Sequence, residues 1–360
     1  MKYKAFILFL GLALCSFQAH AGEPEGGELN VNELILEHIG DEYGWHVTTI
    51  DGHDFAIPLP IIVRSEQTGE WYLFSSARLH GGHAYEERFS ISHEEAHKGK
   101  IVETLADGEV VRPLDFSITK DAFTLIMCSL ILIAVVLYCA RWYRKRQGHP
   151  ELISPSGFIA FMELVIMSVV DGIAKPCCGE HYKRYTPYLL TVFFFIIFVN
   201  LVGLIPIFPG GANVTGNIAV TCVLALFTFA ITNIYGTKEY WKEIFWPDVP
   251  WWLKVPVPIM PAVEFLSIFT KPFALMIRLF ASILAGHALL LGLTCTVFLT
   301  VKLGTGMWAG MTAFSMLLSI FSSFVELLVA YIQAYVFTML SAIYFGLSQV
   351  EPHHAKAVKD

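Results

Sequence analysis

Long apolar stretches separated by short polar interruptions occupy the last two thirds of the chain. Three of them have the length of a membrane-spanning helix, about 20 residues: 121 to 140, about 188 to 206 and about 216 to 235. Two longer ones, about 259 to 301 and 307 to 348, are separated by a Gly-Thr-Gly break at 304 to 306. Each of the two exceeds a perpendicular span, so we expect both to tilt strongly or to lie partly along the membrane.

A further apolar segment, 156 to 174, carries Glu163 and Asp171 and lies between basic clusters. We expect it to be a helix packed at the inner membrane surface and not a span. The pattern therefore predicts a mainly α, polytopic membrane protein with four or five spanning helices, including a long tilted helical hairpin. Residues 349 to 360 are expected to form a tail beyond the last helix.

The first third of the chain shows a different pattern. Runs such as WHVTTI, DFAIPLPIIV and EWYLFSS alternate apolar and polar residues, with turn sequences DGHD and TGEW, which predicts a small β-rich domain over residues 22 to 118. Residues 1 to 21 have two lysines, a short apolar run and an Ala19-His20-Ala21 site, which is typical of a cleaved signal peptide. An uncleaved anchor is the alternative. In either case the domain that follows is expected to be exported.

Composition and charge support this division. Hydrophobic residues make up 55% of the 360 residues and charged residues 15%, with a mean hydropathy of +0.57, which excludes an ordinary soluble enzyme. Residues 22 to 118 carry 6 Lys/Arg and 19 Asp/Glu, a net −13, whereas the remainder carries 18 and 12, a net +6. The exported domain is thus acidic and distinct from the membrane domain, 119 to 348. It has no cysteine and therefore no disulfide framework.

The basic clusters give the expected orientation. The sequence RWYRKR follows the first span, and the loop TKEYWKEIFWPDVPWWLK returns three lysines to the same side, which the positive-inside rule makes cytoplasmic. The loop IFPGGANVTGN has no Lys or Arg, as expected of an external turn. We therefore expect the β-rich domain outside and the C-terminus in the cytoplasm.

Polar residues interrupt the two long apolar segments at positions that the helical period relates. At about 100° per residue, Glu264, Arg278 and Ser282 fall within about 40° of one another. If the Gly-Thr-Gly break makes an antiparallel hairpin, residues whose numbers sum alike lie level. His287 should then meet Glu326, and Gln333, which shares a face with Glu326, should lie level with Arg278.

These residue types point to proton movement. An arginine near the membrane centre costs about 3 to 15 kcal/mol, so it needs a partner or a function. Because guanidinium does not deprotonate, Arg278 cannot relay protons, but it can hold or repel a charge that passes it. A histidine and a carboxylate in contact can exchange protons near neutral pH, so His287 and Glu326 are candidates for an external proton entrance.

Three motifs resemble subunit a of the F-type ATP synthase: EFLSIFTKPFALMIRLFASILAGH (264 to 287), FVELLVAYIQAYVFTMLSAIY (324 to 344) and NLVGLIP (200 to 206). The resemblance covers roughly residues 115 to 348. It implies a non-catalytic, proton-conducting stator subunit with two half-channels that serve a rotating ring of c subunits. It also implies a bacterial inner membrane location, a lipid bilayer environment, contacts with peripheral-stalk b subunits and other ATP synthase subunits, and no cofactor or metal.

Site residues follow from the resemblance by position. Arg278 matches the essential arginine that separates the half-channels, and His287 with Glu326 the titratable pair of the external half-channel. Gln333 matches the glutamine beside the arginine, and Glu264 the carboxylate of the cytoplasmic outlet. The family usually has Gly-Asn after RLF, where this chain has Ala281-Ser282, so the channel role of Ser282 is less defined. Asn217 and Thr221 match a polar patch of the family loosely.

Two other classes of function have a signal in the sequence. A secondary transporter with an intramembrane Arg and His site predicts paired internal repeats, and the sequence has none. Residues 93 to 97, HEEAH, formally match a zinc-hydrolase motif, but their flanks are polar and no third ligand stands out, so we expect neither metal nor hydrolase activity. Nothing in the sequence indicates nucleic-acid binding.

Overall fold

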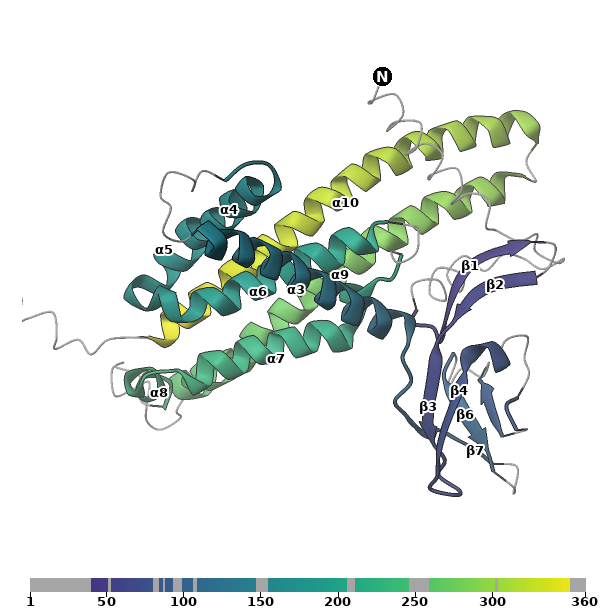
Figure 1. Cartoon of the computed structure of the whole chain (residues 1–360), viewed down its shortest axis with the longest axis horizontal. Coiled ribbons are helices and arrows are strands. Elements are labelled where there is room, and N and C mark those ends of the chain that lie inside the picture. The colour runs from purple at the N-terminus through teal and green to yellow at the C-terminus, as the bar shows by residue number, and fades with distance from the viewer. Residues whose placement is uncertain are drawn as a thin grey trace, which may run out of the picture. The chain divides into compact units, whose positions relative to one another are not determined.

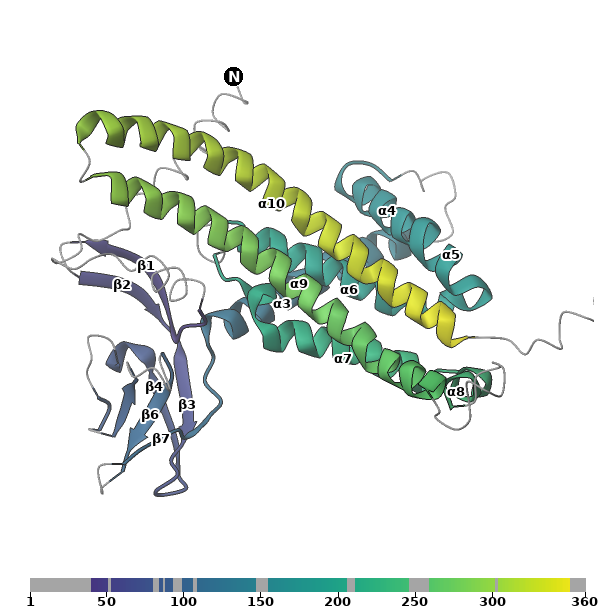
Figure 2. The same cartoon turned by 180° about the vertical axis from the view of Figure 1, so that it is seen from behind.

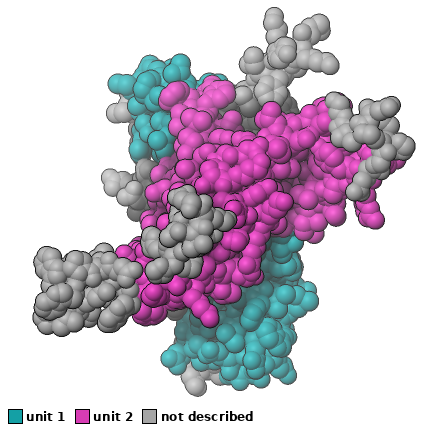
Figure 3. Space-filling model, turned by 90° about the vertical axis from the view of Figure 1, so that its left-hand side faces the viewer, with its two compact units in different colours: residues 1–127, 202–214, 288–319 teal, residues 128–201, 215–287, 320–360 magenta. Residues whose placement is uncertain are grey.

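The structure is a computed structural model of the whole chain. It describes residues 40–50, 53–79, 84–86, 88–92, 99–105, 109–146, 155–205, 211–245, 259–301 and 304–349. The chain divides into two compact units, which Figure 3 shows in different colours. Unit 1 comprises 1–127, 202–214 and 288–319; unit 2 comprises 128–201, 215–287 and 320–360. The expected signal peptide, the HEEAH motif and most of the C-terminal tail lie outside the described residues.

The β region of unit 1 forms three small antiparallel sheets (Figure 1). A hairpin pairs β1 with β2, a second sheet has the order β4-β3-β8, and a third has the order β5-β6-β7. The strands are β1 (Gly44–Ile50), β2 (His53–Pro58), β3 (Pro60–Arg64), β4 (Trp71–Ser75), β5 (Phe89–Ile91), β6 (Ile101–Thr104), β7 (Val110–Val111) and β8 (Leu114–Asp115). The expected β-rich region is confirmed.

Alternation along the strands builds a compact apolar core. On β3, Ile61 and Val63 are fully buried, and they pack with Phe74, Phe89 and Ile101 from three other strands. The buried Tyr43 hydroxyl donates a hydrogen bond to Asp115, and burial, with this bond second, raises the pKa of Tyr43. The strand period of two therefore produces one face buried in this core and one facing outward.

The helical part has the number of spans that the sequence predicts. Four described helical runs are long and apolar enough to cross a membrane, or five if the bent pair α7 and α8 is counted as one span. The helices are α3 (Lys120–Arg146), α4 (Phe158–Val169), α5 (Lys175–Cys178), α6 (Tyr182–Gly203), α7 (Ile218–Ile234), α8 (Lys238–Phe245), α9 (Ile259–Thr300) and α10 (Thr305–Ser348). A π-helical turn, Val170–Ala174, joins α4 to α5.

Both carboxylates of the segment 156 to 174, Glu163 and Asp171, have a polar partner nearby. The hydroxyl of Tyr143 on α3 donates a 2.8 Å hydrogen bond to Glu163, and Lys175 makes a 2.5 Å ion pair with Asp171 one turn away. Both acids therefore have a structural explanation within unit 2.

The core of unit 2 is formed by α6, α9 and α10 together with α4, α5 and the π-helical turn between them. Leu189, Phe193 and Ile196 on α6 are essentially fully buried against residues of the two long helices. Gly346 on α10 is packed so closely that an added Cβ would lie 2.0 Å from the carbonyl oxygen of Cys177. At this point the backbone of α10 and that of α5 are in contact, which requires glycine.

The turn between the two long helices falls where the sequence places it. Gly304 has a φ of 106°, a conformation that favours glycine, and α10 begins at the next residue. Within unit 1 the end of α9 runs beside the start of α10 in both views (Figures 1 and 2), and the Ser315 hydroxyl donates to the Leu293 carbonyl at 3.1 Å. The antiparallel hairpin is thus present.

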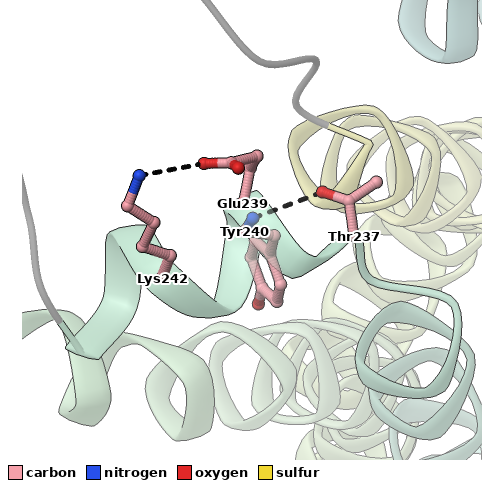
Figure 4. A network of polar contacts seen from close by, with 4 residues as sticks. All are labelled: Thr237, Glu239, Tyr240 and Lys242. Atoms are coloured by element: carbon pink, nitrogen blue, oxygen red, sulfur yellow. Dashed lines mark hydrogen bonds and ion pairs between the residues drawn. The ribbon is translucent and has the colours of Figure 1, made fainter.

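Helix α8 turns by 101° away from the end of α7. Its first turn is stabilised by Thr237, whose hydroxyl accepts a 3.2 Å hydrogen bond from the Tyr240 backbone, and its outer side carries the Lys242 and Glu239 ion pair at 3.5 Å (Figure 4). The aromatic side of α8 packs against α9, where Tyr240 and Ile244 form a small cluster with Ile268.

Candidate functional site

The centre of the candidate site is a histidine and glutamate pair between α9 and α10. The Nδ1 atom of His287 lies 3.5 Å from Oε1 of Glu326, so the two side chains meet as the hairpin arithmetic predicts. Glu326 is 5% exposed, and both of its oxygens lack a hydrogen-bond donor among the described residues. A buried carboxylate without a donor is costly when ionised, so this pair is set up to share or exchange a proton.

Gly286 makes room for that carboxylate. An added Cβ at this position would lie 2.9 Å from Oε1 of Glu326, closer than such atoms approach one another. The residue is therefore part of the site although it contributes no polar atom. Gly286 lies within the Ala-Gly-His motif of the sequence, but the sequence alone gave no indication of this role.

Arg278 lies on a side of α9 that other parts of this chain leave open. Its side chain is exposed, and among the described residues its guanidinium has neither a hydrogen bond nor a carboxylate partner; its charge acts on the Tyr344 hydroxyl. Ala274, Ala281 and Ala285 are exposed one or two turns away on the same side of the helix. The cation thus stands in a strip of small residues, which lets another helix come close.

The other predicted site residues have more local surroundings. The Ser282 hydroxyl donates to the Arg278 carbonyl at 2.8 Å, a bond within the helix that leaves both lone pairs of Oγ able to accept. Asn217 caps α7, where its side chain accepts from the Ala219 backbone at 3.1 Å. Gln333 is half-buried on α10, two turns beyond Glu326.

Glu264 lies near a small, mainly apolar pocket close to the start of α9. It is half-buried and within electrostatic range of the Tyr240 hydroxyl on α8. One turn further along, Ile268 and Pro272 line the pocket, and because proline has no N–H, the Ile268 carbonyl loses its helix partner. The pocket is lined by Thr228, Phe229, Thr232, Asn233, Tyr240, Ile268, Lys271, Pro272, Tyr344 and Leu347. Sequence reasoning did not find this pocket, since its residues come from four helices.

Comparison with known proteins decides the family. Residues 122–346 match the family model "ATP synthase A chain". The chain is 35% identical to ATP synthase subunit a of Anaeromyxobacter dehalogenans over 344 residues, 93% of this chain and 79% of that protein. It is 39% identical to ATP synthase subunit a of Chlorobium phaeobacteroides over 261 residues, 69% of this chain and 71% of that protein.

The chain belongs to the ATP synthase subunit a family. As a subunit a, it is a multi-pass membrane protein and a non-catalytic, proton-conducting component of the membrane sector of the complex. The interpretation of the sequence as a stator subunit is confirmed, and the transporter and hydrolase alternatives are not needed to explain the membrane domain.

The N-terminal region matches a different family model. Residues 34–116 match the model "Domain of unknown function (DUF8433)", so an additional domain precedes the subunit a part. The HEEAH motif falls inside this match but outside the described residues. Among the residues that the structure does describe, no group of three or more His, Cys, Asp or Glu is arranged to hold a metal ion.

Proposed function

We propose that the membrane domain of this subunit a forms two offset proton half-channels that meet at Arg278, next to a rotating ring of c subunits. In this proposal His287 and Glu326 receive protons from the external side. Arg278 keeps the two half-channels apart, and Glu264 lies on the cytoplasmic outlet. Gln333, Ser282 and Asn217 contribute polar groups along the route.

The observation that carries the proposal is the His287 and Glu326 contact. A proton that enters from outside needs an acceptor that can both bind and release it. If the ionised form of that acceptor were too stable it would not take up the proton, and if the ionised form were too costly it would not release it. Glu326 meets that requirement because it is buried without a donor, yet 3.5 Å from an imidazole that becomes a cation when it takes up a proton. Each proton transfer within the pair removes or restores both charges together.

The support for a ring partner comes from the surroundings of Arg278. A permanent cation with no carboxylate partner in the described part of its own chain needs one elsewhere. The strip of Ala274, Ala281 and Ala285 lets a helix with a carboxylate approach the guanidinium closely. A c-subunit helix that carries such a carboxylate satisfies both conditions.

The proposed orientation follows the charges of the loops. The basic end of α3, with Arg144, Lys145 and Arg146, is placed in the cytoplasm together with the C-terminus, and the β region lies in the periplasm of a bacterial inner membrane. Helix α3 exposes apolar side chains such as Leu130, Ile133 and Val136 around much of its surface. Lipid and the b subunits of the peripheral stalk are the proposed neighbours of that surface.

The role of Arg278 is tested by substitution. Arg278→Ala should abolish ATP synthesis and ATP-driven proton pumping, because nothing else in the strip carries a permanent charge. Arg278→Lys should also be severely impaired, since an ammonium group cannot reproduce the planar guanidinium. The measurement is proton pumping in inverted vesicles with the amount of assembled complex matched by quantitative blotting. Normal pumping by the alanine variant would contradict the proposal.

The ring contact is tested by photo-crosslinking in the assembled complex. With p-benzoyl-phenylalanine at position 281, ultraviolet light should capture a small apolar subunit, whereas the same probe at position 226, which is 59% exposed on α7, should not. A shift on gel electrophoresis and mass spectrometry of the adduct identify the partner. Capture at position 226 but not at 281 would place the ring on another face of the protein.

A further inference from the structure

The sheet β4-β3-β8 has an apolar outer face that the core of the β region does not use. Ile61 and Val63 of β3 point into the core, so their neighbours Ile62 and Arg64 point the other way. The register places Leu73 opposite Ile62, and both Trp71 and Leu114 opposite Arg64. These side chains therefore share one face.

That face is unusually exposed for large apolar side chains. Trp71 is 58% exposed, Leu73 72%, Leu114 54% and Phe116 63%. The rings of Trp71 and Phe116 are 5.7 Å apart, and the Arg64 guanidinium lies 6.0 Å from the Trp71 ring. A contiguous patch of this kind on a domain with a net charge of −13 indicates a surface that is covered in the assembled protein. We call these residues, with Ile62 and Arg64, the outer face.

The outer face is attached directly to the start of a membrane helix. Past β8 the chain stays bonded to the sheet region: the Phe116 backbone donates to Ile62 at 2.9 Å and the Ile118 backbone to Pro60 at 3.1 Å. The Lys120 backbone, where α3 begins, donates to Glu42 at 2.9 Å. Four residues of extended chain span at most about 14 Å. Phe116 is therefore within that distance of the first residue of a candidate span.

We propose that the outer face lies against the lipid headgroups of the membrane leaflet in which α3 begins. This contact would keep the β region bound to the bilayer surface. The headgroup region of a bilayer is about 5 to 8 Å deep on each side. A sheet that is hydrogen-bonded to the chain just before the first turn of α3 is close enough to contact this region. Trp and other aromatic side chains favour this region, because their rings accept both apolar chains and polar headgroups.

The side chains of the outer face favour zwitterionic over anionic lipid. Its one cation, Arg64, stands beside the Trp71 ring, where it can bind a lipid phosphate while the apolar side chains lie among the upper acyl chains. The acidic remainder of residues 22 to 118 opposes an anionic surface. Attachment therefore rests on apolar contact with zwitterionic lipid, and it should not weaken as salt is raised.

The test is photo-crosslinking of the complete ATP synthase in native membranes and in nanodiscs of zwitterionic lipid. With p-benzoyl-phenylalanine at position 73 or 116, mass spectrometry should find lipid adducts at least fivefold above those from position 110. Val110 is the matched control, since it is 42% exposed on β7 of the other three-stranded sheet. Adducts with another subunit, or with a second copy of this chain, would show that protein covers the outer face and overturn the proposal.

A second measurement needs no unnatural residue. Brominated lipid quenches tryptophan fluorescence at short range, so the quenched signal of the wild-type complex should fall when Trp71 is replaced by Phe. Trp45→Phe is the comparison, because Trp45 lies on β1 outside this sheet. If both substitutions change the quenched signal equally, or if neither does, the outer face is not at the lipid surface.

Discussion

Two buried glutamates, one in each part of the protein, have opposite surroundings. Glu103 in the β region is fully buried, and its two oxygens accept hydrogen bonds from the Ser65 hydroxyl at 2.5 Å and the Glu66 backbone at 2.9 Å. Glu326 in the membrane region is 5% exposed, and among the described residues neither oxygen has a donor. His287 lies 3.5 Å from one of these oxygens.

The difference separates a carboxylate whose hydrogen bonds are made within the fold from one that we propose takes part in proton transfer. Glu103 joins β6 to the turn after β3, because each of its two oxygens accepts a hydrogen bond from that turn. Glu326 has no such donor among the described residues, and the imidazole of His287 beside it is a group that can take up and release a proton near neutral pH. Burial alone therefore does not distinguish the two carboxylates; the missing hydrogen-bond donors at Glu326 do.

The largest expected effect follows from breaking the membrane pair. Either His287→Ala or Glu326→Ala should lower potential-driven proton flux at least tenfold, because each leaves the other without its exchange partner. The two losses should be far from additive in the double variant, as expected for coupled residues. Proton flux is measured in vesicles with an imposed potential, at matched amounts of assembled complex.

An exchange of the two side chains makes this test sharper. The double variant His287→Glu with Glu326→His keeps both groups within reach and should recover part of the flux that either single exchange loses. Single variants that conduct like wild type, or an exchange no better than the worse single change, would show that the two residues do not act as one unit.

A smaller effect is expected from the glycine that makes room for Glu326. Gly286→Ala places a Cβ 2.9 Å from Oε1, so the carboxylate must shift from its position 3.5 Å from His287, and flux should fall severalfold. Gly292→Ala is the matched control on the same helix, because an added Cβ there meets nothing within 4 Å. Equal flux in the two variants would mean that the carboxylate position is not critical.

The smallest effect on flux is expected at Glu103. Glu103→Ala leaves the Ser65 hydroxyl and the Glu66 N–H without an acceptor and should destabilise the β region by about 2 to 3 kcal/mol. Hydrogen exchange of that region in the assembled complex should rise, while proton flux should stay near wild type. Glu109→Ala, at an exposed carboxylate, is the control. Flux lost with Glu103→Ala would tie the extra domain to proton movement.

Most of the fold could be predicted because long apolar runs and strand alternation are local signals. The break at 304 to 306, the two helices beside it and the first strands all lie close to their predicted positions. The strands β5 to β8 were not found, since they have two to four residues each and depend on pairing with distant partners. The bend between α7 and α8 was also missed, because it is fixed by packing on α9.

The site shows the same limit at the level of single residues. The His287 and Glu326 contact could be predicted, because an antiparallel hairpin relates residue numbers by simple arithmetic. The role of Gly286 could not, since it depends on a side chain 40 positions away. The pocket beside Pro272 needed four helices to be placed first. The predicted position of Gln333 level with Arg278 stays a prediction.

The alanines around Arg278 have a mechanical consequence. A methyl group has no rotamers, so in the proposed ring contact Ala274, Ala281 and Ala285 would give every passing helix the same smooth contour. Larger side chains would interlock with the rotor and would have to rearrange at each step, which would add friction to rotation. With methyl groups in those places, the torque at the proposed contact would act mainly on the guanidinium, and the strip around it would offer the passing helices a smooth sliding surface.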